Sequence, residues 1–535
     1  MTASNTMGNL RQRFTASISL PRFKRAMPAG IKHDTPGIEA WISTLPLDRP
    51  LACCETIVSR LRGALGPIIA PADRVDALDQ IFEHVSPMLA RLEAIPDGRG
   101  GNNGDMRGTI AVADRALERL AMTYAEIAIN EARSRPERRF QVPKFCRRAA
   151  LRACQLAHRR VLLTCRSYGE LNGGHWRVLA ELFMAASVRG FENTSLEVDS
   201  GDTIARYFAR TLLLVLADPH RLSRRNLEHV RFYIERYGHH ARIRTRDEWT
   251  GDAEGWFPAW PAHGDIRRPL RREELMRGEA DLLLDVHPLL AKLDTHCEGL
   301  AAGTSPTRLG LPLIAREGDY PELLKQLRDR WGSPPQRKHI RRKAHPSAAL
   351  VCGFDQVRQL MKRIAGKRQT DAAEAMPAFP STEWSIMDRS EGGLRLNQEA
   401  EDPLAVEVGE LIALSQREDG EVHLAVARRA MHQNSHETEI GVQLISGPGI
   451  AARFKPPTRD AKGRERDSIP IIFLPRVHGL DTHALLAPLD QVEPGLIVAL
   501  PHRNGVVRFE ATGRIERLAG CELIGLKPCP SGNTQ

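Results

Sequence analysis

The sequence of 535 residues lacks a hydrophobic run long enough to cross a membrane. Its apolar runs are short, as at 212–217 (LLLVLA), whereas a transmembrane helix needs about 20 such residues. Its start also has no apolar core of signal-peptide length. We therefore expect no transmembrane segment.

The number and spacing of the cysteines exclude two common classes of small domain. The nine cysteines are odd in number and none of them forms a CxxC pair. A disulfide framework and a structural zinc site each need a recognisable spacing of paired cysteines. We expect free thiols in a reducing compartment, and hence a cytoplasmic protein.

Catalytic and phosphate-binding motifs are also missing. The Gly-rich stretch 97–104 (DGRGGNNG) is not followed by GK[ST], and no GxSxG occurs. His432 and His436 lie four residues apart without a third ligand in view, so we interpret them as part of a polar hairpin loop. We expect a protein that is not an enzyme and has no metal or other cofactor.

Acidic residues are absent from the first 33 positions, which hold six basic residues, and the first acid is Asp34. We interpret 1–36 as a basic disordered tail, with peripheral contact to anionic lipid as the alternative. The whole chain has 76 Lys and Arg against 66 Asp and Glu, a net charge of +10. This excess favours anionic partners but is too small for its length to predict specific nucleic-acid binding.

The chain from 37 to 332 has the periodicity of amphipathic helices. In 223–238 (SRRNLEHVRFYIERYG), apolar residues recur at helical spacing between a Ser that can cap the start and a Gly that can end it. Further helices are predicted at 106–134, 143–171, 176–191, 203–217 and 321–331, the last capped by Asp319. No fixed repeat period is found, so an irregular α-helical bundle or solenoid is expected.

Two stretches interrupt this helical pattern. The segment 251–268 is rich in Trp, Phe and Pro, and we expect an ordered loop there, with an aromatic ligand platform as the alternative. The residues SPPQ at 333–336 directly follow the last predicted helix, and paired prolines mark a boundary.

Beyond this boundary the chain is rich in short Val, Ile and Leu runs separated by turns. Strands are predicted at 348–354, 382–387, 394–397, 410–415, 422–428, 439–445, 469–474, 496–500, 506–511 and 521–526. The connections are too short for crossover helices, which favours antiparallel barrels. The polar stretch 456–467 separates a barrel at 333–447 from a second β-rich unit at 448–535, whose C-terminal end we expect to be disordered.

A polar motif interrupts the strands at 384–396 (WSIMDRSEGGLRL), where Asp388, Ser390 and Gly393 fit the pattern [D/N]-x-S-x-x-G. Upstream, Arg337 and Arg341 fit RxxxR. The arginine pattern alone is common in this chain, but the order of the two motifs is specific. Together they resemble the signatures of the PilZ domain, a small β-barrel family that binds the bacterial messenger cyclic di-GMP.

The resemblance covers roughly 333–447 and implies a PilZ-like antiparallel barrel there. With the helical periodicity upstream and the strands downstream, we expect a multidomain α + β protein: an N-terminal helical domain, this barrel and a second small β-rich unit. It also implies a ligand site. Arg337, Arg341 and the adjacent Arg342 would grip phosphate and guanine edges, since a guanidinium suits both. Asp388 would accept from guanine N–H groups, Ser390 would bond the ligand or brace the turn, and Gly393 would let the backbone come close. Alternate cations are Lys338, Lys343, Arg389 and Arg395.

One departure from the family pattern leaves two possibilities for where the arginines lie relative to the motif. Arg341 and Asp388 are 388 − 341 = 47 residues apart, and the excess includes a helix-like 356–364 and a polar 366–381. This insertion is either a harmless loop, because longer loops cost little entropy, or a displacement of the arginines. The alternative for the motif itself is a bulged hairpin in which Asp388 and Ser390 only satisfy turn amides.

The function predicted is a bacterial cyclic di-GMP receptor whose ligand alters how the helical domain meets a protein partner. A ligand-independent interaction scaffold with a degenerate barrel is the alternative. Nonspecific nucleic-acid binding through the basic surface is a third reading, and it would show steep salt dependence.

Overall fold

The computed structural model describes residues 37–529 with internal gaps. The gaps are 67–69, 94–102, 135–140, 196–200, 250, 252–253, 260–272, 274–281, 317–318, 334–341, 344–346, 368–381, 402–403, 417–420, 434–435, 457–466, 481 and 503–504. The predicted basic tail at 1–36 and the end of the chain at 530–535 lie outside the described residues. The chain divides into two compact units, one of 1–219 and 226–335 and one of 220–225 and 336–535.

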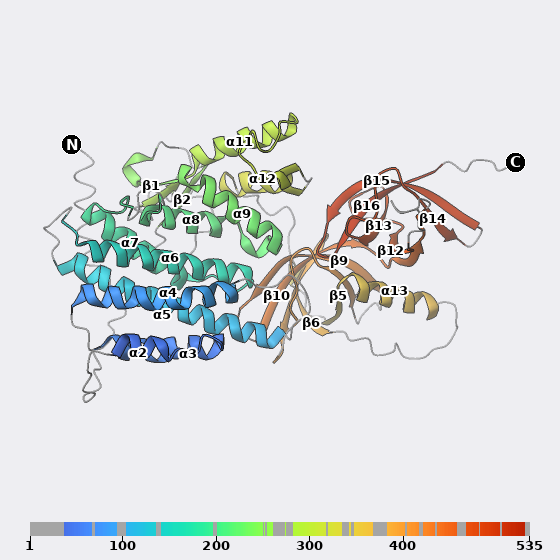
Figure 1. Ribbon diagram of the computed structural model, residues 1–535. Coiled ribbons are helices and arrows are strands. Elements are labelled where there is room, and N and C mark those ends of the chain that lie inside the picture. The colour runs from blue at the N-terminus through green and yellow to red at the C-terminus, as the bar shows by residue number, and fades with distance from the viewer. Residues whose placement is uncertain are drawn as a thin grey trace. The chain divides into compact units, whose positions relative to one another are not determined.

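The first unit is helical, as predicted (Figure 1). Its helices are α2 Gly37–Ser43, α3 Pro50–Leu65, α4 Pro71–Glu93, α5 Asn103–Ser134, α6 Lys144–Arg166, α7 Gly173–Arg189, α8 Ile204–Leu216, α9 Arg224–Tyr237, α11 His287–Ala301 and α12 Asp319–Trp331. Short 3-10 turns η1 Pro219–Arg221, η2 Gly238–His240, η3 Arg246–Glu248 and η4 Leu313–Arg316 join some of them. No helix in the described part of the chain is both long and apolar enough to span a bilayer.

Local chemistry explains where these helices begin and end. The Thr203 hydroxyl accepts from the Arg206 N–H and caps α8, and Asn172 with His175 forms a capping box on α7. Gly190, with φ of 74°, ends α7 in the left-handed conformation that a glycine adopts most easily. The predicted cap Asp319 is instead the first residue of α12. Helix boundaries were therefore predictable to within a few residues.

A small antiparallel sheet lies within the helical unit, and one of its strands falls in the stretch 251–268, where the sequence predicted an ordered loop. It has the order β1 Arg242–Thr245, β3 Leu282–Asp285 and β2 Trp256–Pro258. Trp256 and Phe257 are buried in it. The loop prediction was wrong for these residues, and their burial shows that they pack in a core instead of forming an exposed platform. Trp260 lies outside the described residues.

The first sheet of the second unit closes into a barrel. Its strands are β4 Arg342–Lys343, β5 Ser347–Cys352, β6 Thr382–Ser390, β7 Gly393–Glu399, β8 Leu411–Gln416, β9 Val422–His432 and β10 Glu437–Ser446. The order is β4-β6-β5-β8-β9-β10-β7, and the additional pairing of β6 with β7 closes a ring of six strands, to which β4 is added beside β6. All pairings are antiparallel. The barrel is confirmed.

A second, six-stranded antiparallel sheet follows, as the sequence predicted. Its strands are β11 Ile450–Phe454, β12 Ile469–Leu474, β13 His483–Pro488, β14 Ile497–His502, β15 Gly505–Arg517 and β16 Cys521–Pro528, in the order β11-β12-β13-β16-β15-β14. Of the strands in the second unit, β4, β11 and β13 were not predicted from the sequence. Strand β4 has two exposed residues, and β11 reads IAARF, so neither shows a clear hydrophobic alternation.

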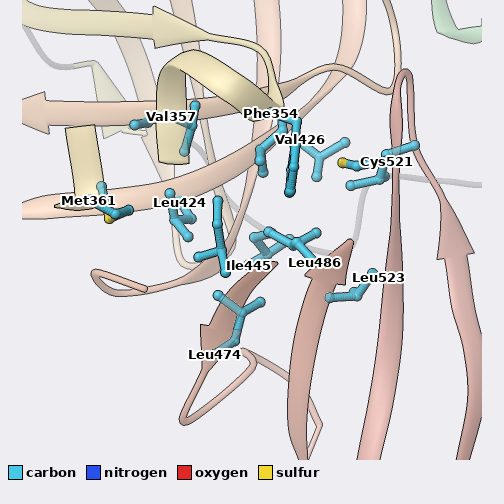
Figure 2. Close-up of a cluster of buried hydrophobic side chains, with 14 of the residues drawn as sticks. Phe354, Val357, Met361, Leu424, Val426, Ile445, Leu474, Leu486, Cys521 and Leu523 are labelled. Carbon is cyan, nitrogen blue, oxygen red and sulfur yellow. The ribbon is translucent and has the colours of Figure 1, made fainter. Parts of the chain in front are cut away.

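The two sheets share one hydrophobic core, shown in part in Figure 2. Helix α13 Phe354–Lys367, predicted at 356–364, contributes Phe354, Val357, Leu360 and Met361 to it. The first sheet adds residues such as Leu424, Val426 and Ile445, and the second adds Ile472, Leu474, Leu486 and Leu523. Because neither sheet covers this face alone, helix α13 fills the joint between them.

Candidate ligand-binding site

The [D/N]-x-S-x-x-G motif forms the tip of the β6–β7 hairpin. Ser390 pairs with Gly393 across a two-residue connection, and Asp388 pairs with Arg395. The Ser390 hydroxyl donates to the Gly393 carbonyl at 3.2 Å, so it braces the turn. The Leu444 N–H of β10 donates to the Gly392 carbonyl at 3.1 Å and ties the tip to the neighbouring strand.

A bulge in β6 decides which way Asp388 points. Ile386 pairs with Leu396 and both are buried, while the next pair is Asp388 with Arg395, so Met387 is left over. Side chains alternate between the two faces of a strand, so without this extra residue Asp388 would share the interior face of Ile386. The bulge turns the carboxylate to the outer face of the barrel, where polar recognition can occur.

The arginine segment reaches the barrel beside this carboxylate. In β4, Arg342 pairs with Arg389 and Lys343 pairs with Asp388, and both β4 residues are exposed. Arg337 and Arg341 lie outside the described residues. The described parts of the long connection between the motifs are β5, which pairs with β6, and α13.

The Asp388 side chain belongs to a row of alternating charges on the outer face. It is 15% exposed, and its Oδ2 lies 3.8 Å from Arg395 Nη1. Arg395 Nη2 lies 2.5 Å from Oε2 of Glu439 on β10, and Oε1 of Glu439 accepts from Arg429 Nη1 of β9 at 2.6 Å. The Glu439 side chain is only 4% exposed, so two guanidinium groups neutralise a buried carboxylate.

Sequence reasoning named Asp388, Ser390, Gly393 and Arg342, and the structure brings them to one edge of the barrel. It named Arg395 only as an alternate cation and missed Glu439 and Arg429. No local signal marks those two residues, since Arg428 and Glu437 are equivalent charges in the same strands and bond elsewhere. Their association depends on strand register, in which Arg395 and Arg429 both pair with Gly441.

The His432 and His436 pair lies at the β9–β10 connection, as predicted. His432 Nδ1 lies 2.9 Å from the Thr438 hydroxyl, which is an ordinary cross-strand contact. No group of three or more possible metal ligands was found among the described residues.

The model of the cyclic-di-GMP receptor FimW N-terminal domain matches residues 36–248, and that of the FimW middle PilZ domain matches 354–449. The chain belongs to the FimW family of cyclic-di-GMP receptors. A search of curated proteins finds no match.

This FimW-family assignment confirms the PilZ resemblance, the helical N-terminal domain and the receptor function predicted from the two motifs. The matched PilZ stretch contains Asp388, Ser390 and Gly393. It begins downstream of Arg337, Arg341 and Arg342, so the match carries no information on the arginines. The role of the family is to bind a messenger, and catalysis is no part of its description.

Proposed function

We propose that this receptor binds cyclic di-GMP where β4 meets the β6–β7 hairpin. The single observation that carries this proposal is the pairing of Arg342 and Lys343 with Arg389 and Asp388, because it sets a basic strand against the acidic corner of the motif. A ligand with two phosphates and two guanines needs both kinds of group within one ligand length.

Each residue has a distinct role in this proposal. Asp388 accepts from guanine N–H groups, as a carboxylate on the outer face is able to do. Arg342, together with Arg337 and Arg341 just upstream, pairs with phosphates and guanine edges. Ser390 and Gly393 shape the turn, and the Ser390 hydroxyl braces it by donating to the Gly393 carbonyl.

The arginines also suggest how binding is transmitted. Residues 334–341 connect the helical unit to the barrel unit in the chain, so engaging Arg337 and Arg341 restrains this connection. An ordered connection changes how the helical domain, 37–332, is presented to a protein partner. We retain 333–447 and 448–535 as the boundaries of the PilZ domain and second β-rich domain, and we infer a non-enzymatic cytoplasmic effector without a cofactor.

Calorimetric titration with cyclic di-GMP tests the site. We expect Asp388→Ala, Arg341→Ala and Arg342→Ala each to weaken binding by about tenfold or more, the scale of one lost charge-assisted contact. Glu510→Ala and Arg508→Ala replace exposed charges on β15 and should bind as the wild type does. Unchanged affinity in the Asp388 and arginine variants would reject this site, and no nucleotide-dependent thermal shift at all would favour the interaction scaffold.

A further inference from the structure

Glu439 is a buried carboxylate on a strand between two arginine-bearing strands. It pairs with Asn397 of β7 and Met431 of β9, while Gly441, two residues further along β10, pairs with both Arg395 and Arg429. Residues two apart on a strand share a face. Since Gly441 has no side chain, the two guanidinium groups can lean across it from either side and meet at Glu439.

Glu439 has an electrostatic role in addition to its packing. Moving a carboxylate from water into a site with 4% exposure is costly unless it is paired and hydrogen-bonded. Both of its oxygens are engaged, Oε2 by Arg395 and Oε1 by Arg429. The carboxylate in turn fixes where the two guanidinium groups lie.

Arg395 lies between the carboxylates of Asp388 and Glu439 and is hydrogen-bonded to the buried one, Glu439. Its Nη2 lies 2.5 Å from Glu439, whereas its Nη1 lies 3.8 Å from Asp388, beyond hydrogen-bonding distance. Asp388 is nevertheless directly opposite Arg395 in the hairpin. A small rotation of the arginine side chain would therefore close it onto Asp388.

We propose that Glu439 is a positioning residue for ligand recognition, which holds Arg395 back from Asp388. This inference rests on the proposed function, in which Asp388 receives guanine N–H groups. When Glu439 loses its charge, Arg395 turns to Asp388, the other carboxylate that it contacts, and forms charge-assisted hydrogen bonds with it. Those bonds compete with guanine for the same oxygens, and ligand affinity falls.

The test is a rescue experiment by calorimetry with cyclic di-GMP on the full chain. We expect Glu439→Gln to weaken binding about tenfold, because one acceptor becomes occupied by a cation. Adding Arg395→Gln to that variant removes the competitor, and affinity should return to within about threefold of Arg395→Gln alone. A purely structural role predicts instead that the second substitution adds to the loss.

A matched control separates competition from general loosening of the charge row. Arg429→Gln removes the other guanidinium partner of Glu439, so in the Glu439→Gln background it should not restore binding. The comparison of the two double variants holds even where the single variant folds poorly: we expect the one lacking Arg395 to bind at least about fivefold tighter. Equal affinities of the two double variants, each checked for folding by circular dichroism, would overturn the inference.

The outcomes also separate this inference from the proposed site. When Asp388→Ala binds as tightly as the wild type, the proposed site itself is wrong. When Asp388→Ala is impaired and the two double variants bind equally, the site stands and only the positioning role of Glu439 is lost.

Discussion

Gly393 lies so close to the backbone of Val442 that a Cβ atom at position 393 would overlap the Val442 carbonyl oxygen. The two residues belong to the paired strands β7 and β10, and the obstacle is main chain, which has no rotamer to change. The neighbouring Gly392 has open space around the position of its missing Cβ. Of these two adjacent glycines, only Gly393 lies so close to another strand that a larger residue would not fit.

The first prediction follows from this contrast. Gly393→Ala should lower the free energy of unfolding by about 1–3 kcal/mol, because β7 or β10 must shift to admit a methyl group. It should also weaken cyclic di-GMP binding, since the shift moves the tip next to Asp388. Gly392→Ala is the matched control and should change stability by less than about 0.5 kcal/mol. Urea unfolding and titration of both variants check this, and equal behaviour would contradict it.

The second prediction concerns the core that joins the two sheets. Leu485 and Leu486 are consecutive, fully buried residues of β13, but Leu486 packs in the shared core and Leu485 in a cluster confined to the second sheet. Each substitution by Ala should cost about 2–5 kcal/mol. Hydrogen exchange should separate them: Leu486→Ala should increase exchange in β8 and β9 more than Leu485→Ala does. Equal exchange there would contradict a shared core.

The third prediction concerns an ion pair across the same joint. Arg428 of β9 and Glu516 of β15 form a bidentate pair, with Nη2 and Oε2 2.7 Å apart, and both side chains are about one-third exposed. After allowance for solvent screening, a double-mutant cycle with alanine should give a coupling of about 1 kcal/mol. Glu322 and Lys325, exposed on α12 with one contact of 3.8 Å, form a single-contact comparison pair, expected at about 0.2–0.5 kcal/mol. A coupling for Arg428 and Glu516 no larger than this would contradict the prediction.

The fourth prediction is a pH dependence of the helical unit. Burial, aided by the charges of Arg210 and Arg231, lowers the pKa of His158 to about 4, and its Nδ1 lies 2.8 Å from the Thr211 hydroxyl. The unfolded chain, with a His pKa near 6.5, then binds more protons than the native state between these values. Stability should therefore rise with pH across this window and fall on acidification.

At pH 5 the loss relative to pH 7.5 should be about 2 kcal/mol from this group alone. Urea unfolding followed by far-ultraviolet circular dichroism measures it. His158→Gln should reduce the difference between the two pH values, because the amide can still bond Thr211 without titrating. The exposed His84 provides the control, and His84→Gln should keep the wild-type difference. A His158→Gln variant with an unchanged pH dependence would contradict the assignment.

Much of this protein could be predicted from local sequence. Helices α5 to α9 and α12 were predicted from apolar spacing and caps, whereas α2, α3, α4 and α11 were not individually predicted. Most strands of the second unit were predicted from short β-branched runs, and the ligand motif from three residues within a stretch of six. Segment 256–258 was misjudged because Trp and Pro suggest a loop, whereas burial makes a strand of WFP. Strands β4 and β13 were missed because pairing with a neighbour, and not their own pattern, makes them strands.

The sequence by itself determined the fold class, the family and the polar tip of one hairpin, since those depend on the order of residues within a few turns of chain. Only the tertiary structure decided that Asp388 lies opposite Arg395, because one extra residue in β6 shifts the register of pairing after it. It also decided that Glu439 lies between Arg395 and Arg429. These residues come from three strands, and the register of pairing, which no local pattern encodes, brings their charges together.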